Sequence, residues 1–111
     1  MKKDRWPVIL EDSFRENVSQ GWAVSVLCIE TAKRSYSSWT GKWQVFCVSP
    51  DGQERELLVL RKNIEPRVIL TSHGVTSFLM DLGITVSVVP MLEGQTIEIT
   101  PPDKKILVGA L

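Results

Sequence analysis

The chain has 111 residues, of which 43% are hydrophobic and 23% charged, and its 13 Lys and Arg balance 13 Asp and Glu. This length suits one domain, and the apolar content with zero net charge excludes a disordered chain and a strongly basic nucleic-acid coat. No apolar run approaches the roughly 18 residues of a membrane span. Acidic residues interrupt the segment after Pro7 where a signal peptide would be apolar. We therefore expect one cytoplasmic domain over residues 1–111, without membrane contact.

The first third of the chain predicts a lead-in followed by a strand. Residues 1–20 predict an irregular or partly helical lead-in, in which Ser13 caps a short helix and Glu16 completes a capping box. Residues 22–31 are rich in β-branched residues, lack Pro and predict a strand that is covered to some degree on both faces. The small polar residues of 32–42 predict a loop or a frayed hairpin tip.

A β-hairpin is predicted next. Two apolar segments, 43–49 and 54–61, flank the sequence Ser49-Pro50-Asp51-Gly52-Gln53. Proline presets φ at the first corner of a turn, and glycine accepts the positive φ that a hairpin loop requires. The two segments are therefore predicted to pair as antiparallel strands.

A helix is predicted after the hairpin, because apolar residues recur at helical spacing within 66–82. Either one helix spans this whole segment, with Pro66 in its first turn, or a short turn precedes a helix that begins at Ser72, a competent N-cap. In both cases Gly83 stands where a left-handed residue ends a helix.

The last third predicts two more strands. Residues 84–90 alternate in polarity and predict a fourth strand; residues 93–95 predict a turn, and 96–100 a fifth strand that Pro101 and Pro102 end. The tail, 103–111, is expected to be loose, and its apolar end either pairs at a sheet edge or frays. Together these elements predict an α+β fold, with a mainly antiparallel sheet of about five strands and one principal helix packed on it.

Residue types that carry chemistry are sparse. Cys28 and Cys47 lie within apolar runs and are expected to pack in the core, with a disulfide or redox pair as the alternative. His73, the single histidine, is expected to face solvent or neighbour a helix cap. Thr40-Gly41-Lys42 lacks the upstream glycine of a phosphate loop. We predict no catalytic residues, no metal and no cofactor, and an enzyme with a shallow pocket is the least favoured alternative.

One segment combines aromatic and basic residues. Residues 31–47 contain no acidic residue. Trp22 and Trp43 begin predicted strands and are expected to anchor the core, whereas Tyr36 and Trp39 lie in the predicted loop or hairpin tip. Flat rings interleaved with cations are suited to binding single-stranded nucleic acid. The same residue types anchor protein interfaces, so the residues alone do not favour nucleic acid over a protein partner. The candidate contact residues are Lys33, Arg34, Tyr36, Trp39 and Lys42.

The order of features from Trp43 onward resembles a known module. The sequence Trp43-Gln-Val-Phe-Cys-Val-Ser-Pro-Asp-Gly-Gln-Glu-Arg-Glu is followed by an apolar strand, by a helix ending Phe78-Leu-Met-Asp-Leu-Gly-Ile84, and by a strand closing at Val89-Pro90. Over about residues 22–101 this is similar to the N-terminal module of helicase- or primase-like ATPases carried by phages, plasmids and integrative elements. No Walker-type sequence occurs here, so the resemblance implies an accessory module beside mobile-element DNA, without ATP hydrolysis and without a transferred catalytic residue.

Two functions are therefore expected. The first is a small non-enzymatic module of a mobile genetic element that contacts nucleic acid, with single-stranded DNA favoured. The second is a protein-interaction module, a small inhibitor or a subunit of a larger assembly, which is suggested by the zero net charge and the apolar end of the tail. Salt distinguishes them, because phosphate binding weakens steeply with ionic strength and an apolar interface barely responds.

Overall fold

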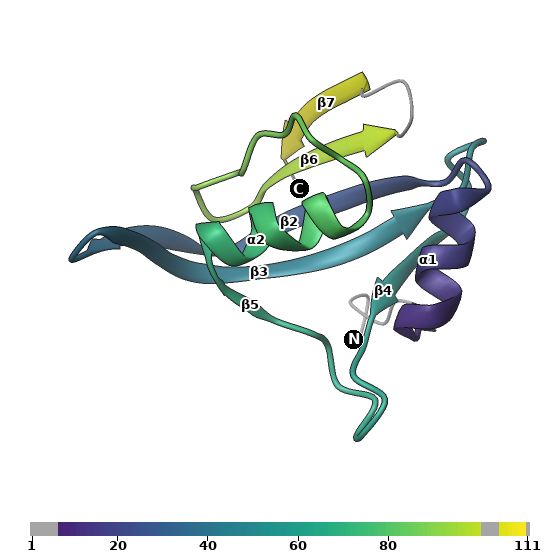
Figure 1. Ribbon diagram of the computed structural model, residues 1–111, viewed down its shortest axis with the longest axis horizontal. Coiled ribbons are helices and arrows are strands. Elements are labelled where there is room, and N and C mark those ends of the chain that lie inside the picture. The colour runs from purple at the N-terminus through teal and green to yellow at the C-terminus, as the bar shows by residue number, and fades with distance from the viewer. Residues whose placement is uncertain (1–6, 101–104, 111) are drawn as a thin grey trace.

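A mixed β-sheet with two helices on one face makes up the described part of the chain, residues 7–100 and 105–110 of a computed structural model (Figure 1). The predicted α+β class is confirmed, with seven strands and two helices in these residues in place of about five strands and one principal helix. In chain order the elements are β1 (Val8–Ile9), α1 (Glu11–Ser19), β2 (Ala23–Ser35), β3 (Ser38–Val48), β4 (Arg55–Leu58), β5 (Ile69–Thr71), α2 (Ser72–Asp81), β6 (Gln95–Thr100) and β7 (Lys105–Ala110).

The sheet is built around the long pair β2 and β3. The strand order is β1-β4-β3-β2-β6-β7. The short strand β5 is not part of this order and pairs with β3. β1 runs parallel to β4, whereas the other pairings among the described strands are antiparallel. The prediction of a mainly antiparallel sheet therefore holds. The two tryptophans expected at the core are also found there, because Trp43 is fully buried and Trp22 packs against the buried cluster.

Both helices cover the same face of the sheet. Phe14 of α1 and Phe78 of α2 meet edge to face with their ring centroids 5.9 Å apart, and both belong to the cluster that contains Val26 and Val45 of the central strands. The opposite face of β2 is also covered in part, since Ser25 is buried there between neighbouring strands. The expectation that both faces of this strand are covered is thus confirmed.

The first helix begins earlier than predicted. It starts at Glu11 with Leu10 at the N-cap and no capping side chain, so the prediction that Ser13 caps it is wrong. Ser13 lies inside the first turns, because the helix must start earlier to bury Phe14. The acidic residues of its first turn, Glu11 and Asp12, complement the positive end of the helix dipole.

Of the two alternatives for 32–42, the hairpin tip is found and the loop is not, because this segment is the outer half of a long, paired hairpin. β2 continues to Ser35, β3 begins at Ser38, and only Tyr36 and Ser37 form the turn. The polar composition left the loop open as an alternative, because a ribbon that is exposed to water on both faces needs no apolar alternation. Two register shifts in β2, on either side of Glu30, mark bulges or irregularities of the kind that bend and twist a ribbon.

The hairpin between residues 43 and 61 is confirmed, although its second strand is shorter than expected. Gly52 has a φ of +77°, and the Asp51 carboxylate accepts hydrogen bonds from the Ser49 hydroxyl (2.6 Å) and the Gln53 N–H (2.9 Å). The returning strand, β4, ends at Leu58. The chain then turns back, so that Val59 forms an isolated bridge with Pro66.

The longer of the two helices considered for 66–82 does not form. Pro66 lies in an extended segment that leads into β5, and α2 begins at Ser72. The cap is Thr71, one residue before the expected one, and its hydroxyl accepts a hydrogen bond from the Gly74 N–H at 2.9 Å. Gly83 follows the helix with a φ of +87°, as predicted.

The prediction of a strand at 84–90 is wrong. This segment is irregular: Ile84 is buried, whereas Val86 and Val88 are exposed. The place beside β2 that such a strand would need is taken by β6, which confirms the predicted strand at 96–100. The tail pairs with β6 as β7 at the sheet edge, while Pro101 and Pro102 lie outside the described residues.

Candidate functional site

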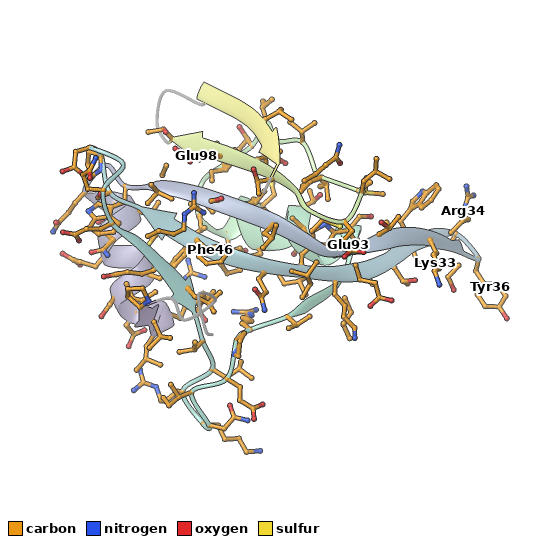
Figure 2. All side chains as sticks on the ribbon, turned by 180° about the vertical axis from the view of Figure 1, so that it is seen from behind. Lys33, Arg34, Tyr36, Phe46, Glu93 and Glu98 are labelled. Carbon is orange, nitrogen blue, oxygen red and sulfur yellow. The ribbon has the colours of Figure 1, made fainter. Side chains whose placement is uncertain are left out.

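All five predicted contact residues lie on one projecting hairpin, residues 30–42, which we call the arm. The arm is the outer half of β2 and β3 and extends beyond the two helices (Figure 1). Arg34 is in register with Trp39, and Lys33 with Thr40. Figure 2 shows Lys33, Arg34 and Tyr36 at the far end of the arm. The five residues predicted from the sequence therefore belong to one continuous structural unit, the hairpin that was one of the two alternatives for this segment.

Tyr36 forms the tip of the arm. Its side chain is 97% exposed and points away from the ribbon (Figure 2). Its φ is +57°, a conformation that glycine, asparagine and aspartate adopt far more readily than an aromatic residue. The left-handed conformation costs a residue with a Cβ roughly 1–2 kcal/mol. A bulky ring is thus held in water at a position where its backbone is unfavourable.

Trp39 and Arg34 form a stacked pair beside the tip. The guanidinium carbon of Arg34 lies 5.8 Å from the centroid of the Trp39 ring, which places the cation over the indole. The Arg34 Nε also donates a hydrogen bond to the Tyr36 carbonyl at 2.9 Å. Trp39 remains 40% exposed. The side chain of Arg34 is therefore oriented by two contacts within the arm, and its charge stays at the surface.

The two lysines have different surroundings. Lys42 pairs with Glu30 on the neighbouring strand, with Nζ 3.5 Å from the carboxylate, and both groups are about half exposed. Lys33 has no ion pair among the described residues. Both lysines line a shallow depression of about 410 Å³ between the arm and β5, to which Leu70 and Thr71 also contribute. The positive charge of the arm is thus concentrated at its outer end.

Neighbours that are distant in sequence modify the base of the arm. Glu93 is brought there because its N–H donates to the Thr31 hydroxyl at 2.8 Å, and the Ala32 N–H donates to the Met91 carbonyl at 2.8 Å. The acid-free window of the sequence therefore has acidic neighbours in space, which a search along the chain could not find. Gly41 was also missed: a Cβ there would lie 2.8 Å from the Glu30 carbonyl oxygen, so the two strands approach too closely for a side chain.

The two thiols belong to the core. Cys28 and Cys47 are both free and buried, as expected, and they are not opposite each other, because Cys47 is in register with Val24. Burial raises the pKa of the Cys47 thiol to about 11, although the Asn17 amide opposes this effect and the Glu56 carboxylate adds to it. Burial also raises the pKa of Cys28. Both thiols are therefore protonated and poorly nucleophilic at neutral pH.

The raised pKa of Cys47 predicts a loss of stability in alkali. The folded state retains the thiol proton up to about pH 11, whereas the ordinary thiol pKa is 9.0. The stabilisation is therefore complete below the lower value and is lost as the pH rises toward the upper one, by up to about 2 kcal/mol. We expect urea midpoints to fall more steeply over this range for the native chain than for Cys47→Ala. Equal slopes would contradict the prediction.

Metal-ligating residue types and pockets also occur outside the arm in the described residues. No set of three or more His, Cys, Asp or Glu side chains is positioned to hold a metal within 7–100 and 105–110. His73 is exposed in the first turn of α2. An open depression of about 640 Å³ lies near the ends of the two helices, and its charged residues are Arg15 and Asp81. Arg15 is engaged there by Glu11 at 2.9 Å and by the Asp81 carbonyl at 3.3 Å.

Comparison with known proteins adds no assignment. No protein-family model matches the sequence, and no match is found among curated proteins or solved structures. The resemblance to helicase- and primase-associated modules therefore stays a prediction. Neither of the two described helices is long and apolar enough to cross a membrane.

Proposed function

We propose that this protein is a small non-enzymatic module that contacts single-stranded nucleic acid through the arm. The observation that carries the proposal is the exposed Tyr36 ring, held at a positive φ beside the stacked pair of Arg34 and Trp39. An aromatic ring in water at the end of a projecting hairpin contributes nothing to the core. Its backbone strain is of the kind that persists where function requires a particular side chain.

The chemistry of the arm suits unpaired bases. Each base that stacks on an aromatic side chain contributes roughly 1–3 kcal/mol, and stacking tolerates any base because every base has a π-face. Tyr36 and Trp39 offer two such surfaces close to the tip. Lys33 and Arg34 lie beside them and supply cations for the phosphates.

The role of the module is proposed to be accessory. The arm is proposed to hold a strand on which another protein acts, because its exposed aromatic and basic residues offer binding chemistry. Its setting in a mobile genetic element rests on the resemblance over residues 22–101.

Binding and its salt dependence test the proposal. The purified chain is titrated into a fluorescein-labelled oligothymidylate and into a duplex of equal length, between about 50 and 200 mM salt. Fluorescence anisotropy reports binding, and tryptophan quenching reports stacking. Two phosphate contacts, at Lys33 and Arg34, predict a slope of about −1.4 in log K against log salt for the single strand.

A charge-matched pair of variants locates the surface. Lys33→Ala is expected to weaken binding and to reduce the salt slope by about 0.7, the value of one phosphate contact on a single strand. Lys62→Ala removes the same charge from the exposed turn between β4 and β5. It is expected to leave the affinity and the salt slope unchanged. An absence of binding at the lowest salt, or equal effects of the two variants, would refute the proposal.

A protein partner is the second candidate, and one observation favours it. The ion pair between Lys42 and Glu30 lowers the net charge at the base of the arm, and Tyr, Trp and Arg are the residues that most often dominate protein interfaces. If the arm binds a protein, a partner captured by the native chain should bind with an affinity that is almost independent of salt. The Tyr36→Ala variant should no longer bind that partner.

A further inference from the structure

The strand β7 ends the sheet with an edge that is open in the described residues. It pairs with β6 through six consecutive residue pairs, from Gln95 with Ala110 to Thr100 with Lys105, without a register shift. No described strand pairs with its other side. Figure 1 shows β7 at the outside of the sheet, beside β6. In an antiparallel strand alternate residues direct their N–H and C=O groups to each side, so an edge strand has unpaired hydrogen-bonding groups on its outer side.

Beyond Lys105 at its start, this edge lacks the features that usually prevent edge-to-edge pairing. Edge strands of natural proteins are commonly protected by charged residues, proline, a bulge or very short length. After Lys105 the strand reads Ile-Leu-Val-Gly-Ala, with no charge and no proline, and its unshifted register excludes a bulge against β6. The strand at the opposite edge, β1, has only two residues. β7 is thus the edge that is competent to extend the sheet.

Val108 shows that the apolar face of the sheet continues past the helices. It is in register with Ile97, and directly opposed residues in an antiparallel pair share a face. Ile97 is only 2% exposed and belongs to the main core, whereas Val108 is 70% exposed. The core face therefore extends to an uncovered valine at the open edge.

We propose that β7 pairs antiparallel with β7 of a second copy of this chain, so that one sheet runs through a symmetric dimer. A two-fold axis beside Val108 sets Ile106 of one copy opposite Ala110 of the other, and Leu107 opposite Gly109. The paired segment 106–110 then contains no charged residue in either copy. The same axis places the two Lys105 positions at opposite ends of the pair. An edge that complements itself in this way forms an isologous interface.

Sedimentation of the full chain without nucleic acid tests the dimer, so the result does not depend on the proposed function of the arm. The native chain is expected to show a reversible monomer–dimer equilibrium at concentrations up to about 1 mM. Val108→Lys places a charge on the edge and is expected to shift the dissociation constant at least tenfold toward the monomer. The control is Val86→Lys, a substitution of a valine that is 60% exposed in the irregular segment before β6, and it should leave the equilibrium unchanged.

Cross-linking gives a second readout that does not need a destabilised interface. Val108→Cys brings two thiols together at the two-fold axis and is expected to yield a disulfide-linked dimer under mild oxidation. Val86→Cys should remain monomeric on a denaturing gel, and the native thiols are buried. A native chain that stays monomeric up to about 1 mM, or a dimer that Val108→Lys and Val86→Lys weaken equally, would overturn the proposal.

Discussion

Replacing Tyr36 and Trp39 together with alanine is expected to weaken the binding of a single-stranded oligonucleotide at least about tenfold. Each base stacked on an aromatic side chain contributes roughly 1–3 kcal/mol, and 1.4 kcal/mol corresponds to a factor of ten. Both side chains are exposed, at 97% and 40%, so the fold should survive the change. Fluorescence anisotropy at low salt measures the loss, and circular dichroism verifies the fold.

A glycine variant separates binding from stability at the tip. Because Tyr36 has a φ of +57°, Tyr36→Gly relieves backbone strain, and we expect the free energy of unfolding to stay level or to rise by about 1 kcal/mol. The same variant should bind nucleic acid more weakly, since the ring is gone. A control pair, Met80→Ala with Val86→Ala, removes exposed apolar side chains from α2 and the segment that follows it. If the control pair and the double alanine variant bound equally well, Tyr36 and Trp39 would not be the contact surface.

Local chemistry explains the elements that were predicted correctly. The turn at 49–53 is determined by its own Ser, Asp and Gly residues, through hydrogen bonds within five residues of sequence. Gly83 ends α2 because a left-handed residue is needed there, and its N–H bonds to the Met80 carbonyl at 2.9 Å. Signals of this kind do not depend on distant partners, so they can be recognised in the sequence.

The elements that were predicted wrongly depend on distant partners. Segment 84–90 alternates as a strand should, but β6 occupies the edge of β2, and the segment crosses over the core without pairing. Segment 69–71 lies within the longer of the two helices considered for 66–82, yet it pairs with β3. In both cases the competition for a strand edge decided the outcome, and a single sequence does not reveal that competition.

The residues of the candidate site could be predicted from the sequence, but the charges that surround them could not. The five contact residues are close in sequence, so the hairpin necessarily brings them together. Glu30 and Glu93 were not considered, because the first lies just outside the acid-free window and the second reaches the arm only through the fold. The unusual conformation of Tyr36 was also hidden, since a tyrosine gives no signal of a positive φ.

Replacing Trp43 with alanine is expected to have the largest effect on stability. The side chain is fully buried, and its Nε1 donates a hydrogen bond to the Pro90 carbonyl at 2.6 Å. A large-to-small change of a buried aromatic residue costs about 3–5 kcal/mol, which is a large part of the roughly 5–15 kcal/mol that stabilises a typical domain. Urea unfolding followed by circular dichroism should show a much lower midpoint. The exposed Trp39→Ala should change it by less than about 0.5 kcal/mol.

A more conservative variant tests the reason for this effect. Trp43→Phe keeps most of the apolar volume but leaves the Pro90 carbonyl without its donor, which is expected to cost about 1–3 kcal/mol. That bond ties the irregular segment 84–90 to the centre of β3, and the same ring passes under Gly41 at the base of the arm. Faster amide hydrogen exchange should therefore appear first in this segment and at the base of the arm. If exchange rose equally across the whole sheet, Trp43 would support the core in general and would have no particular role in holding the arm.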